Sequence, residues 1–288
     1  MTTIISRNLN LYFKEKTTIF FSLLSSLIIL VLYFAFLKQN YTESLKSLKE
    51  GAQFADIWLL AGLLSVTGMT TTFQAMTQLV VDKTTGRMRA FRLTQTSRLS
   101  VYLGYFFSSV IIGILMQIAV FMIGFGILSA VDGIGFSLYQ VLLTTLAIIL
   151  NSLVSAALSL ILLSGVKKSS SLTSLGTIIG TLSGFLSGVY IPMRALPEIG
   201  QTIIKCYPGA YSASLFRHIL LADQLKITFA PLSPDKLLDF KADFGIGLSL
   251  SGQLTTVVSE SIILLFATLG LLIGSVIILK ITPIVKLS

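Results

Sequence analysis

Two long apolar runs, Leu59–Val81 and Val101–Leu128, enclose a short basic segment, and long apolar runs recur along the whole chain. About 20 apolar residues in a helix cross the hydrocarbon core of a bilayer. Of the 288 residues, 54% are hydrophobic and 11% are charged, whereas soluble domains carry roughly 25% charged residues. The sequence therefore predicts an all-α integral membrane protein with six transmembrane helices. The expected spans are Ile19–Leu37, Trp58–Val81, Val101–Leu128, Val141–Ser164, Ser171–Ile191 and Val257–Leu279.

The basic segment Asp82–Ser100 carries five cations and a single acid. Its cations are Lys83, Arg87, Arg89, Arg92 and Arg98. Loops rich in Lys and Arg stay on the cytoplasmic side of a membrane. With six spans, the side that holds this segment and both termini carries 12 cations and two acids, and the opposite side carries nine of each. We therefore expect both termini in the cytoplasm. The net charge of +9 then reflects membrane orientation rather than nucleic-acid binding.

The same segment has features of a docking element. Gly86 favours a sharp turn, and after it Met88 and Phe91 would share one face of a short helix. Arg89 and Arg92 would lie on an adjoining face. An apolar pair framed by cations suits an acidic, grooved partner surface. The alternative is an ordinary basic loop that only sets membrane orientation, and composition does not separate the two.

Residues 4–16 alternate with a helical period before the first span. Ile5 and Leu9 fall on one face, and Arg7 and Lys14 on another. This pattern predicts an amphipathic helix that lies in the membrane interface. A cleaved signal peptide is the alternative, but the apolar stretch that follows is too long for one.

The long segment Pro192–Thr256 lies before the last span, on the expected outer side. An apolar pattern of helical period between Pro197 and Pro208 predicts one short helix, and a similar pattern over Tyr211–Leu220 predicts another. Both are too short to span, so we expect two re-entrant helices that dip into the outer leaflet or lie on it. The stretch Ala222–Gln253 is rich in Ser, Pro and Gly and is expected to form an exposed outer loop.

Span two is more polar than the other spans, with several hydroxyl and amide side chains. A helix of this composition does not face lipid on all sides, so part of it is a candidate lining for a substrate path. The candidate path residues are Thr70, Gln74, Thr77 and Gln78 in this span and Glu260 in the last.

Span five carries four glycines spaced four residues apart. They are Gly176, Gly180, Gly184 and Gly188. Small residues at this spacing let another helix approach closely. The ridge therefore predicts a subunit interface or a moving wall of a pathway. Packing within the chain is the alternative.

The chain lacks the groups that most enzymes need. Glu260 is essentially the one ionisable residue inside a span, and it either snorkels to the outer interface or faces a cavity. The spans hold no nucleophile with a base and no carboxylate pair, and the chain has no Walker A motif. A single cysteine, Cys206, and a single histidine, His218, exclude an internal disulfide and a Cys- or His-rich metal site. We expect neither catalysis nor a bound cofactor in this chain.

Three stretches resemble the ABC-2 family of ABC transporter permeases. Arg7–Lys16 is similar to the family's amphipathic connecting helix, within an expected element over residues 4–18. Val81–Gly104 resembles the pattern of the cytoplasmic coupling element, here residues 82–100, although the family more often has glutamate at the position of Asp82. Ser187–Leu220 resembles the family's Ser-Gly, Ile-Pro, Leu-Pro, Tyr-Pro and Arg spacing through the outer re-entrant helices, in an outer segment of residues 192–256.

The resemblance implies a single transmembrane domain over residues 1–288 that works in the plasma membrane of a bacterial cell. It implies that two permease subunits, identical or related, pair through spans one and five. Each would dock on a separate ABC ATPase that binds ATP and Mg²⁺. It further implies export of a drug, an antimicrobial peptide or a similar small amphipathic compound. A glycan or ion exporter, and a non-transporting receptor or assembly factor of the same fold, are the alternatives.

Overall fold

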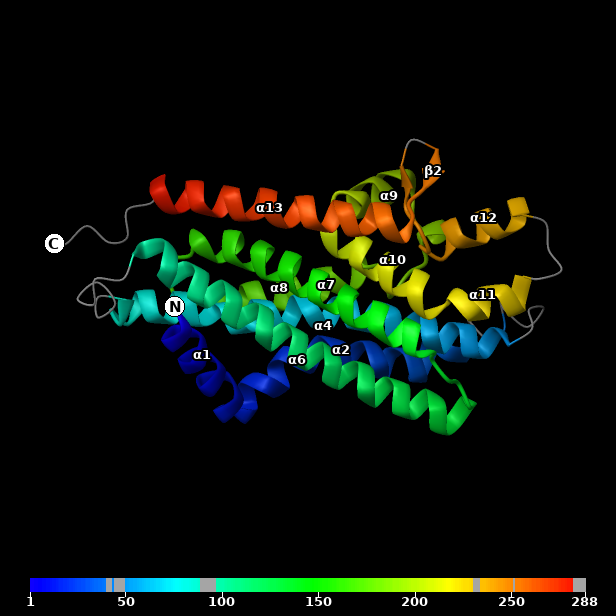
Figure 1. Cartoon of the computed structure of the whole chain (residues 1–288), viewed down its shortest axis with the longest axis horizontal. Coiled ribbons are helices and arrows are strands. Elements are labelled where there is room, and N and C mark those ends of the chain that lie inside the picture. The colour runs from blue at the N-terminus through cyan, green and yellow to red at the C-terminus, as the bar shows by residue number, and fades with distance from the viewer. Residues whose placement is uncertain (40–42, 44–49, 89–96, 230–233, 251, 282–288) are drawn as a thin grey trace.

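The computed structural model describes residues 1–39, 43, 50–88, 97–229, 234–250 and 252–281. These residues form an elongated bundle of α-helices with one small antiparallel hairpin, which confirms the all-α fold (Figure 1). The helices are α1 (Thr2–Lys14), α2 (Lys16–Leu32), the π-helix η1 (Tyr33–Leu37), α4 (Gly51–Thr84), α6 (Arg98–Asp132), α7 (Leu138–Ser164), α8 (Ser171–Leu186), the 3-10 helix η2 (Met193–Ala195), α9 (Glu198–Lys205), α10 (Pro208–Leu220), α11 (Ala222–Phe229), α12 (Pro234–Asp243) and α13 (Val257–Ile281). The strands are β1 (Ser249–Leu250) and β2 (Gln253–Leu254).

Several helix ends follow from local sequence. Ser97 caps α6, where its hydroxyl accepts the backbone N–H of Ser100. Ser137 and Gln140 form a reciprocal capping box at the start of α7. Between these helices, Gly133 ends α6 with φ of +65°, a conformation that glycine adopts without strain. Pro208 occupies the first turn of α10, where its missing N–H costs nothing.

The expectation of six spans is confirmed in part. Four helices, α4, α6, α7 and α13, are long and apolar enough to cross a membrane. The pair α1 and α2 is a fifth candidate, bent by 79° at Glu15. The apolar helix α8 has 16 residues and ends at Leu186, so it rises only about 24 Å against a hydrocarbon core of about 30 Å. The chain leaves the helical path five residues before the expected end of span five.

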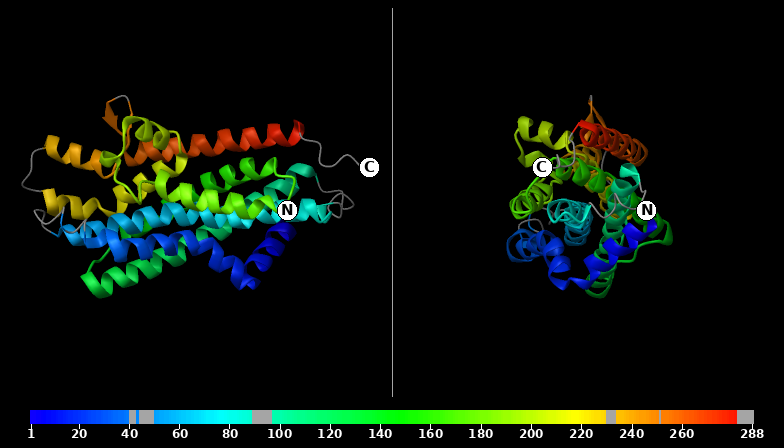
Figure 2. Two further views of the ribbon diagram at one scale, coloured as in Figure 1. Left: turned by 180° about the vertical axis from the view of Figure 1, so that it is seen from behind. Right: turned by 90° about the vertical axis from the view of Figure 1, so that its left-hand side faces the viewer.

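Helix α4 lies at the centre of the bundle, and the other long helices surround it in the end-on view (Figure 2). Its most apolar window is completely buried, whereas only 17% of the corresponding window of α13 is buried. This explains why the most polar span is also the innermost one. Most of its hydroxyl groups are satisfied inside the protein, as with Thr71, which donates to the carbonyl of Thr67 on its own helix.

An amide pair ties α4 to α6 and α7 deep in the bundle. Asn151 Nδ2 donates to Gln117 Oε1 at 2.8 Å and to the carbonyl oxygens of Leu64 and Ser65 at 3.3 Å. Gln117 Nε2 in turn donates to Ser152 Oγ at 2.7 Å. Gly68 leaves the space that the Asn151 amide fills. Such interhelical hydrogen bonds stabilise packing where lipid removes the hydrophobic driving force.

The two ends of the bundle differ. The N-terminus, the last turn of α4 and the last turn of α13 lie toward one end (Figure 1). We call it the Asp82 end, because Asp82 is in that turn of α4. The opposite end, which we call the Trp58 end, holds the first turns of α4 together with α11 and α12. Helix α8 ends in a turn at Gly188, which has φ of +63°. Helix α10 then runs toward the Trp58 end among α4, α7 and α13, from Gly209 beside Ser65 to Arg217 over the Trp58 ring.

The expectation of an exposed loop after α10 is wrong in part. Residues 222–253 contain α11, α12 and the hairpin strands β1 and β2, which pair in antiparallel register. Between α12 and β1, the irregular residues Gly245–Leu248 are buried. The Ser, Pro and Gly content of this stretch marked turns correctly but gave no sign that a turn would be covered.

Candidate functional site

The expected coupling segment begins at the Asp82 end of α4. The helix ends at Thr84, and Gly86, with φ of +76°, makes the turn that the sequence predicts. Arg87 follows with its side chain 60% exposed. Arg89, Phe91 and Arg92 lie outside the described residues. Arg98 is exposed at the first turn of α6.

Asp82 is the centre of this end. Its side chain is fully buried, and Arg7 of α1 binds it with two hydrogen bonds, Nη1 to Oδ2 at 2.6 Å and Nη2 to Oδ1 at 2.9 Å. Tyr105 of α6 donates its hydroxyl to Oδ2 at 2.5 Å, and Gln78 donates to Oδ1 at 2.9 Å. Arg87 Nη1 lies 3.8 Å from Oδ1. One carboxylate thus joins α1, α4, α6 and the start of the basic segment.

Because the Asp82 carboxylate is buried, it requires these hydrogen-bond and charge partners. A buried carboxylate loses its hydration, and only paired charge and hydrogen bonds recover that free energy. The bidentate guanidinium contact also fixes the orientation of its partner. If helix α1 left the bundle, the charge of Asp82 would become either exposed or buried without its partner.

Further contacts dock α1 on α6. Asn8 donates to Ser108 Oγ at 3.1 Å, and both side chains are buried. Ile4 packs where α6 has Gly104, since a Cβ there would lie 2.9 Å from Ile4 Cγ2. The predicted amphipathic helix is present, and its buried face is the one that includes Ile4, Asn8 and Tyr12.

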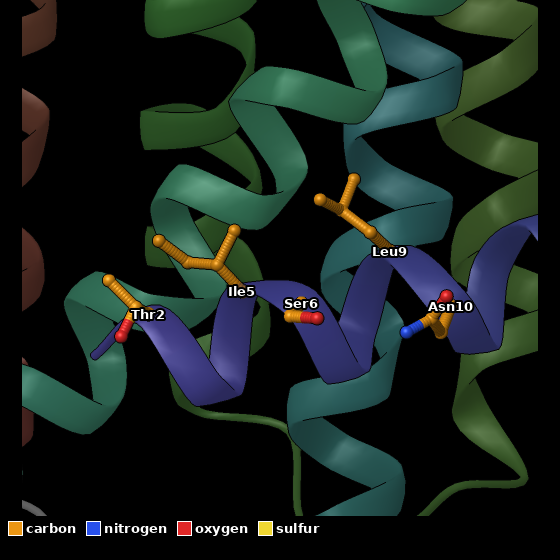
Figure 3. A pocket seen from close by; sticks show the side chains of 5 residues that line it. All are labelled: Thr2, Ile5, Ser6, Leu9 and Asn10. Carbon is orange, nitrogen blue, oxygen red and sulfur yellow. The ribbon is translucent and has the colours of Figure 1, made fainter.

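The outer face of α1 is partly open. A shallow groove of about 300 Å³ lies along this helix. Ile5 and Leu9, two of its lining residues, project from α1 in the same direction (Figure 3). Thr2, Ser6 and Asn10 complete its lining. Ile5 and Leu9 are half-buried, and Leu9 packs against the cluster that includes Tyr12, so only part of the predicted apolar face is exposed.

Two residues of the expected coupling set point inward. Lys83 Nζ donates to the carbonyl of Ser164, in the last turn of α7, at 3.3 Å and lies 5.5 Å from the ring centre of Tyr102. A cation at the C-terminal end of a helix is favourable. Met88 is buried in the cluster formed by α4, α6 and α7. These two residues connect the basic segment to the bundle, and Arg87 and Arg98 lie on its surface.

The glycines of α8 face groups of the same chain. Gly180 lies against Ser25 of α2, Gly184 against Tyr190, and Gly176 is near Phe73 of α4. Gly188 lies in the turn after the helix, near Arg217. These contacts agree with the alternative interpretation of the ridge, in which the glycines pack within one chain.

Beside this ridge, α2 and α8 form an open apolar groove of about 480 Å³. Its lining includes Ile28, Phe36, Phe185 and Tyr190, and Phe36 is 68% exposed. The π-helix η1 carries Phe36, and its first residue, Tyr33, is held by a hydrogen bond to the buried Asp56 at 2.7 Å.

The candidate path residues occupy three settings. Gln74, Thr77 and Gln78 are half-buried on one face of α4 toward the Asp82 end, at positions i, i+3 and i+4. Thr70 is buried and bonds to carbonyls of its own helix. Glu260 is fully buried near the Trp58 end, so the interpretation that it snorkels is wrong.

Glu260 is surrounded by hydrogen-bonding groups. Its Oε1 accepts the hydroxyls of Ser214 at 2.5 Å and Thr255 at 2.7 Å, and Oε2 lies 3.1 Å from His218 Nδ1. Within the described residues, no three His, Cys, Asp or Glu side chains are placed to hold a metal ion. The chemistry at both ends is therefore that of hydrogen-bonded carboxylates.

Sequence reasoning missed the two carboxylate centres. Asp82 was visible as the single acid in a basic segment, and Arg7 as a cation on the polar face of its helix, but 75 residues separate them. Tyr105 carried no signal at all, because an aromatic residue in a span is expected to face lipid or other helices. Only the helix packing reveals that these three side chains meet.

We expect Arg7→Met to destabilise the protein by about 3–5 kcal/mol, because it leaves the buried Asp82 carboxylate uncompensated. Asp82→Asn should cost less, because the Arg7 side chain is 30% exposed. The double variant should lose less than the sum, since neither charge remains. Chemical unfolding in mixed micelles measures these free energies. Arg194→Met is the control, because it breaks the exposed pair with Asp243 and should change stability little. Additive losses in the double variant would contradict the pairing.

A protein-family model described as ABC-2 type transporter matches residues 1–221 of the chain. The match covers α1 to α10 and therefore includes Asp82, Arg7, Tyr105 and the groove between α2 and α8. No curated protein matches the chain.

Proposed function

Since this chain belongs to the ABC-2 type transporter family and is a transporter permease subunit, we propose that it exports a small amphipathic compound with energy from separate ABC ATPase subunits. Permeases of this family work with such ATPases. The substrate would be a drug, an antimicrobial peptide or a chemically similar molecule. The Asp82 end would face the cytoplasm, where the positive-inside rule places its cations.

The observation that carries this proposal is the buried Asp82 centre. An ATPase docked on the basic segment pulls or pushes on the end of α4. Because Asp82 also binds Arg7 and Tyr105, the same displacement reaches α1 and α6. Lys83 extends it to the last turn of α7 through Ser164. Packed elements of this kind move as units, which turns a small local shift into a helix rearrangement.

The half-buried face of α4 supplies a polar path next to this centre. Gln74 and Thr77 lie on that face, and Gln78 donates to Asp82 as well. A substrate that meets these amides and hydroxyls would be one helical turn or two from the coupling centre. An amphipathic compound suits this lining, because the surrounding helices are apolar.

The basic segment would bind the ATPase through an apolar anchor with cations at its rim. Buried anchors hold an interface, whereas rim charges mainly steer association. We expect Phe91→Ala to weaken binding by about 1–3 kcal/mol, as for interface hot spots, and more than Arg89→Ala does. Phe20→Ala, at an exposed position of α2, is the matched control and should bind like the parent.

The measurement is recovery of the ATPase with the solubilised permease, together with substrate-stimulated ATP hydrolysis. The exporter function predicts a co-purifying ATPase whose turnover rises with substrate. Parent-like recovery and stimulation in both loop variants would limit the segment to setting membrane orientation. A receptor or assembly factor would bind its partner without substrate-stimulated turnover.

We further propose that a second permease subunit covers the groove between α2 and α8. Phe185, Phe36 and Ile28 line the groove and are exposed, and Ile178 and Leu182 are exposed on α8 as well. The aromatic residues Phe185 and Phe36 suit a packed interface, where aromatic side chains are enriched. The match to the transporter family includes both helices, and the resemblance in sequence implies pairing at these spans.

Crosslinking tests the pairing. In a Cys206→Ser background, Thr181→Cys in the groove should form a disulfide-linked dimer in membranes on oxidation. Leu269→Cys, on the exposed face of α13, is the control and should remain monomeric. Equal yields at the two positions would mean that the groove faces lipid rather than a second subunit.

A further inference from the structure

A short irregular segment, Phe244–Leu248, crosses the Trp58 end between α12 and β1, and we call it the strap. Its residues Gly245–Leu248 are buried, with Ile246 fully so. Buried backbone needs hydrogen-bond partners, and here side chains of other elements supply many of them. The family match ends at residue 221, so the strap lies beyond it.

Glu260 holds the strap through two hydroxyl groups. The backbone N–H of Gly247 donates to Ser214 Oγ at 2.7 Å, and that of Leu248 donates to Thr255 Oγ1 at 2.8 Å. Both hydroxyls donate in turn to Glu260 Oε1. The carboxylate therefore orients the two acceptors that the strap needs, which is a role for its charge at this buried position.

The carbonyl side of the strap is held from two helices. Trp58 Nε1 of α4 donates to the carbonyl of Phe244 at 2.8 Å. Arg217 of α10 lies over the Trp58 ring at 4.5 Å and reaches the carbonyl of Gly245 at 3.5 Å. Arg217 also donates to the carbonyls of Ser187 and Gly188 at 3.1 and 2.9 Å. The strap is thereby joined to the turn that ends α8.

The backbone of the strap has a hinge on each side of Ile246. Gly245 has φ of +63° and Gly247 has φ of +90°, a region that favours glycine. Lifting the strap requires rotation at these glycines and release of contacts to side chains. The backbone hydrogen bonds of the strap to Lys241 and Thr255 must also break, or α12 and the hairpin must move with it. Lifting the strap does not require any helix of the bundle to unwind. Its hydroxyl and carbonyl contacts can re-form when it returns.

We propose that the strap is a latch that closes the Trp58 end at rest and lifts during each transport cycle, with Glu260 as its positioning residue. This inference rests on the proposed exporter function, in which substrate leaves at that end. The latch connects α8, α10 and α13, so movement of α8 relative to α10 strains it through Arg217. Lifting it uncovers the end of α10.

Labelling of Ile246→Cys in a Cys206→Ser background tests the latch. The permease and its ATPase are reconstituted together, and a membrane-impermeant maleimide is added on the Trp58 side. We expect slow labelling at rest and labelling at least about tenfold faster during ATP turnover. Leu250→Cys, exposed on β1, should label rapidly in both states and reports access of the reagent.

Removing one hydroxyl should open the latch without ATP. Thr255→Val keeps the shape of the side chain, and loss of a hydrogen bond to a charged group shifts the open population about tenfold or more. Resting Ile246→Cys should then label as fast as during turnover, and Glu260→Gln should act in the same direction. Thr202→Val, exposed on α9, is the matched control and should leave labelling slow.

The outcomes separate the two claims. ATP-driven transport in the parent complex with unchanged labelling of Ile246→Cys would overturn the latch alone. If Thr255→Val and Glu260→Gln left the labelling rate of Ile246→Cys unchanged, the role of the hydroxyl pair and of Glu260 would be overturned. Absence of ATP-driven transport in the parent complex would overturn the exporter function, and the latch as a part of it.

Discussion

The burial of the Asp82 carboxylate is the constraint on which the rest of this structure depends. A charge in that position requires donors from every side, and they come from α1, α6 and α4 itself. The requirement fixes where the amphipathic helix docks and how the basic segment leaves the bundle. Under the proposed function, force from the ATPase would enter at this end, where a rigid joint would pass the displacement to the helices instead of absorbing it.

A second buried carboxylate, Glu260, has the corresponding place at the other end. Its donors are two hydroxyls, with His218 beside them, rather than a bidentate guanidinium. Charge-assisted bidentate pairs are stronger and more directional than bonds to neutral hydroxyls. The difference fits a permanent joint at the Asp82 end and a closure that can be released at the Trp58 end.

Much of the fold could be predicted because membrane helices reveal themselves by length and composition. The long helices lie where the apolar runs place them, and the break at Glu15 separates the amphipathic helix from the first span. The length of α8 was overestimated, because the apolar residues after Leu186 continue past Gly188, whose positive φ ends the helical path. Hydropathy measures affinity for lipid and does not detect a turn made of apolar residues.

The candidate site was predictable only where its parts are close in sequence. Gly86 and Arg87 were found because a turn and exposed cations leave local signals, whereas the inward direction of Lys83 depends on α7. Glu260 was misjudged because two of its neighbours, Ser214 and His218, come from α10, 46 and 42 residues away in the sequence. Its position near the end of a span suggested solvent, yet the strap and α10 cover it. Pairings over such separations follow from packing and not from pattern.

The central claim is that Asp82 makes α1, α4 and α6 one unit that moves under the ATPase. Spin labels at Asn10 on α1 and Leu99 on α6, both exposed, measure it directly by pulsed electron paramagnetic resonance. The account predicts the same distance distribution in the nucleotide-free and ATP-trapped complex, and a broader one in Asp82→Asn. A shift of the Asn10–Leu99 distance between the two states of the parent protein would contradict it.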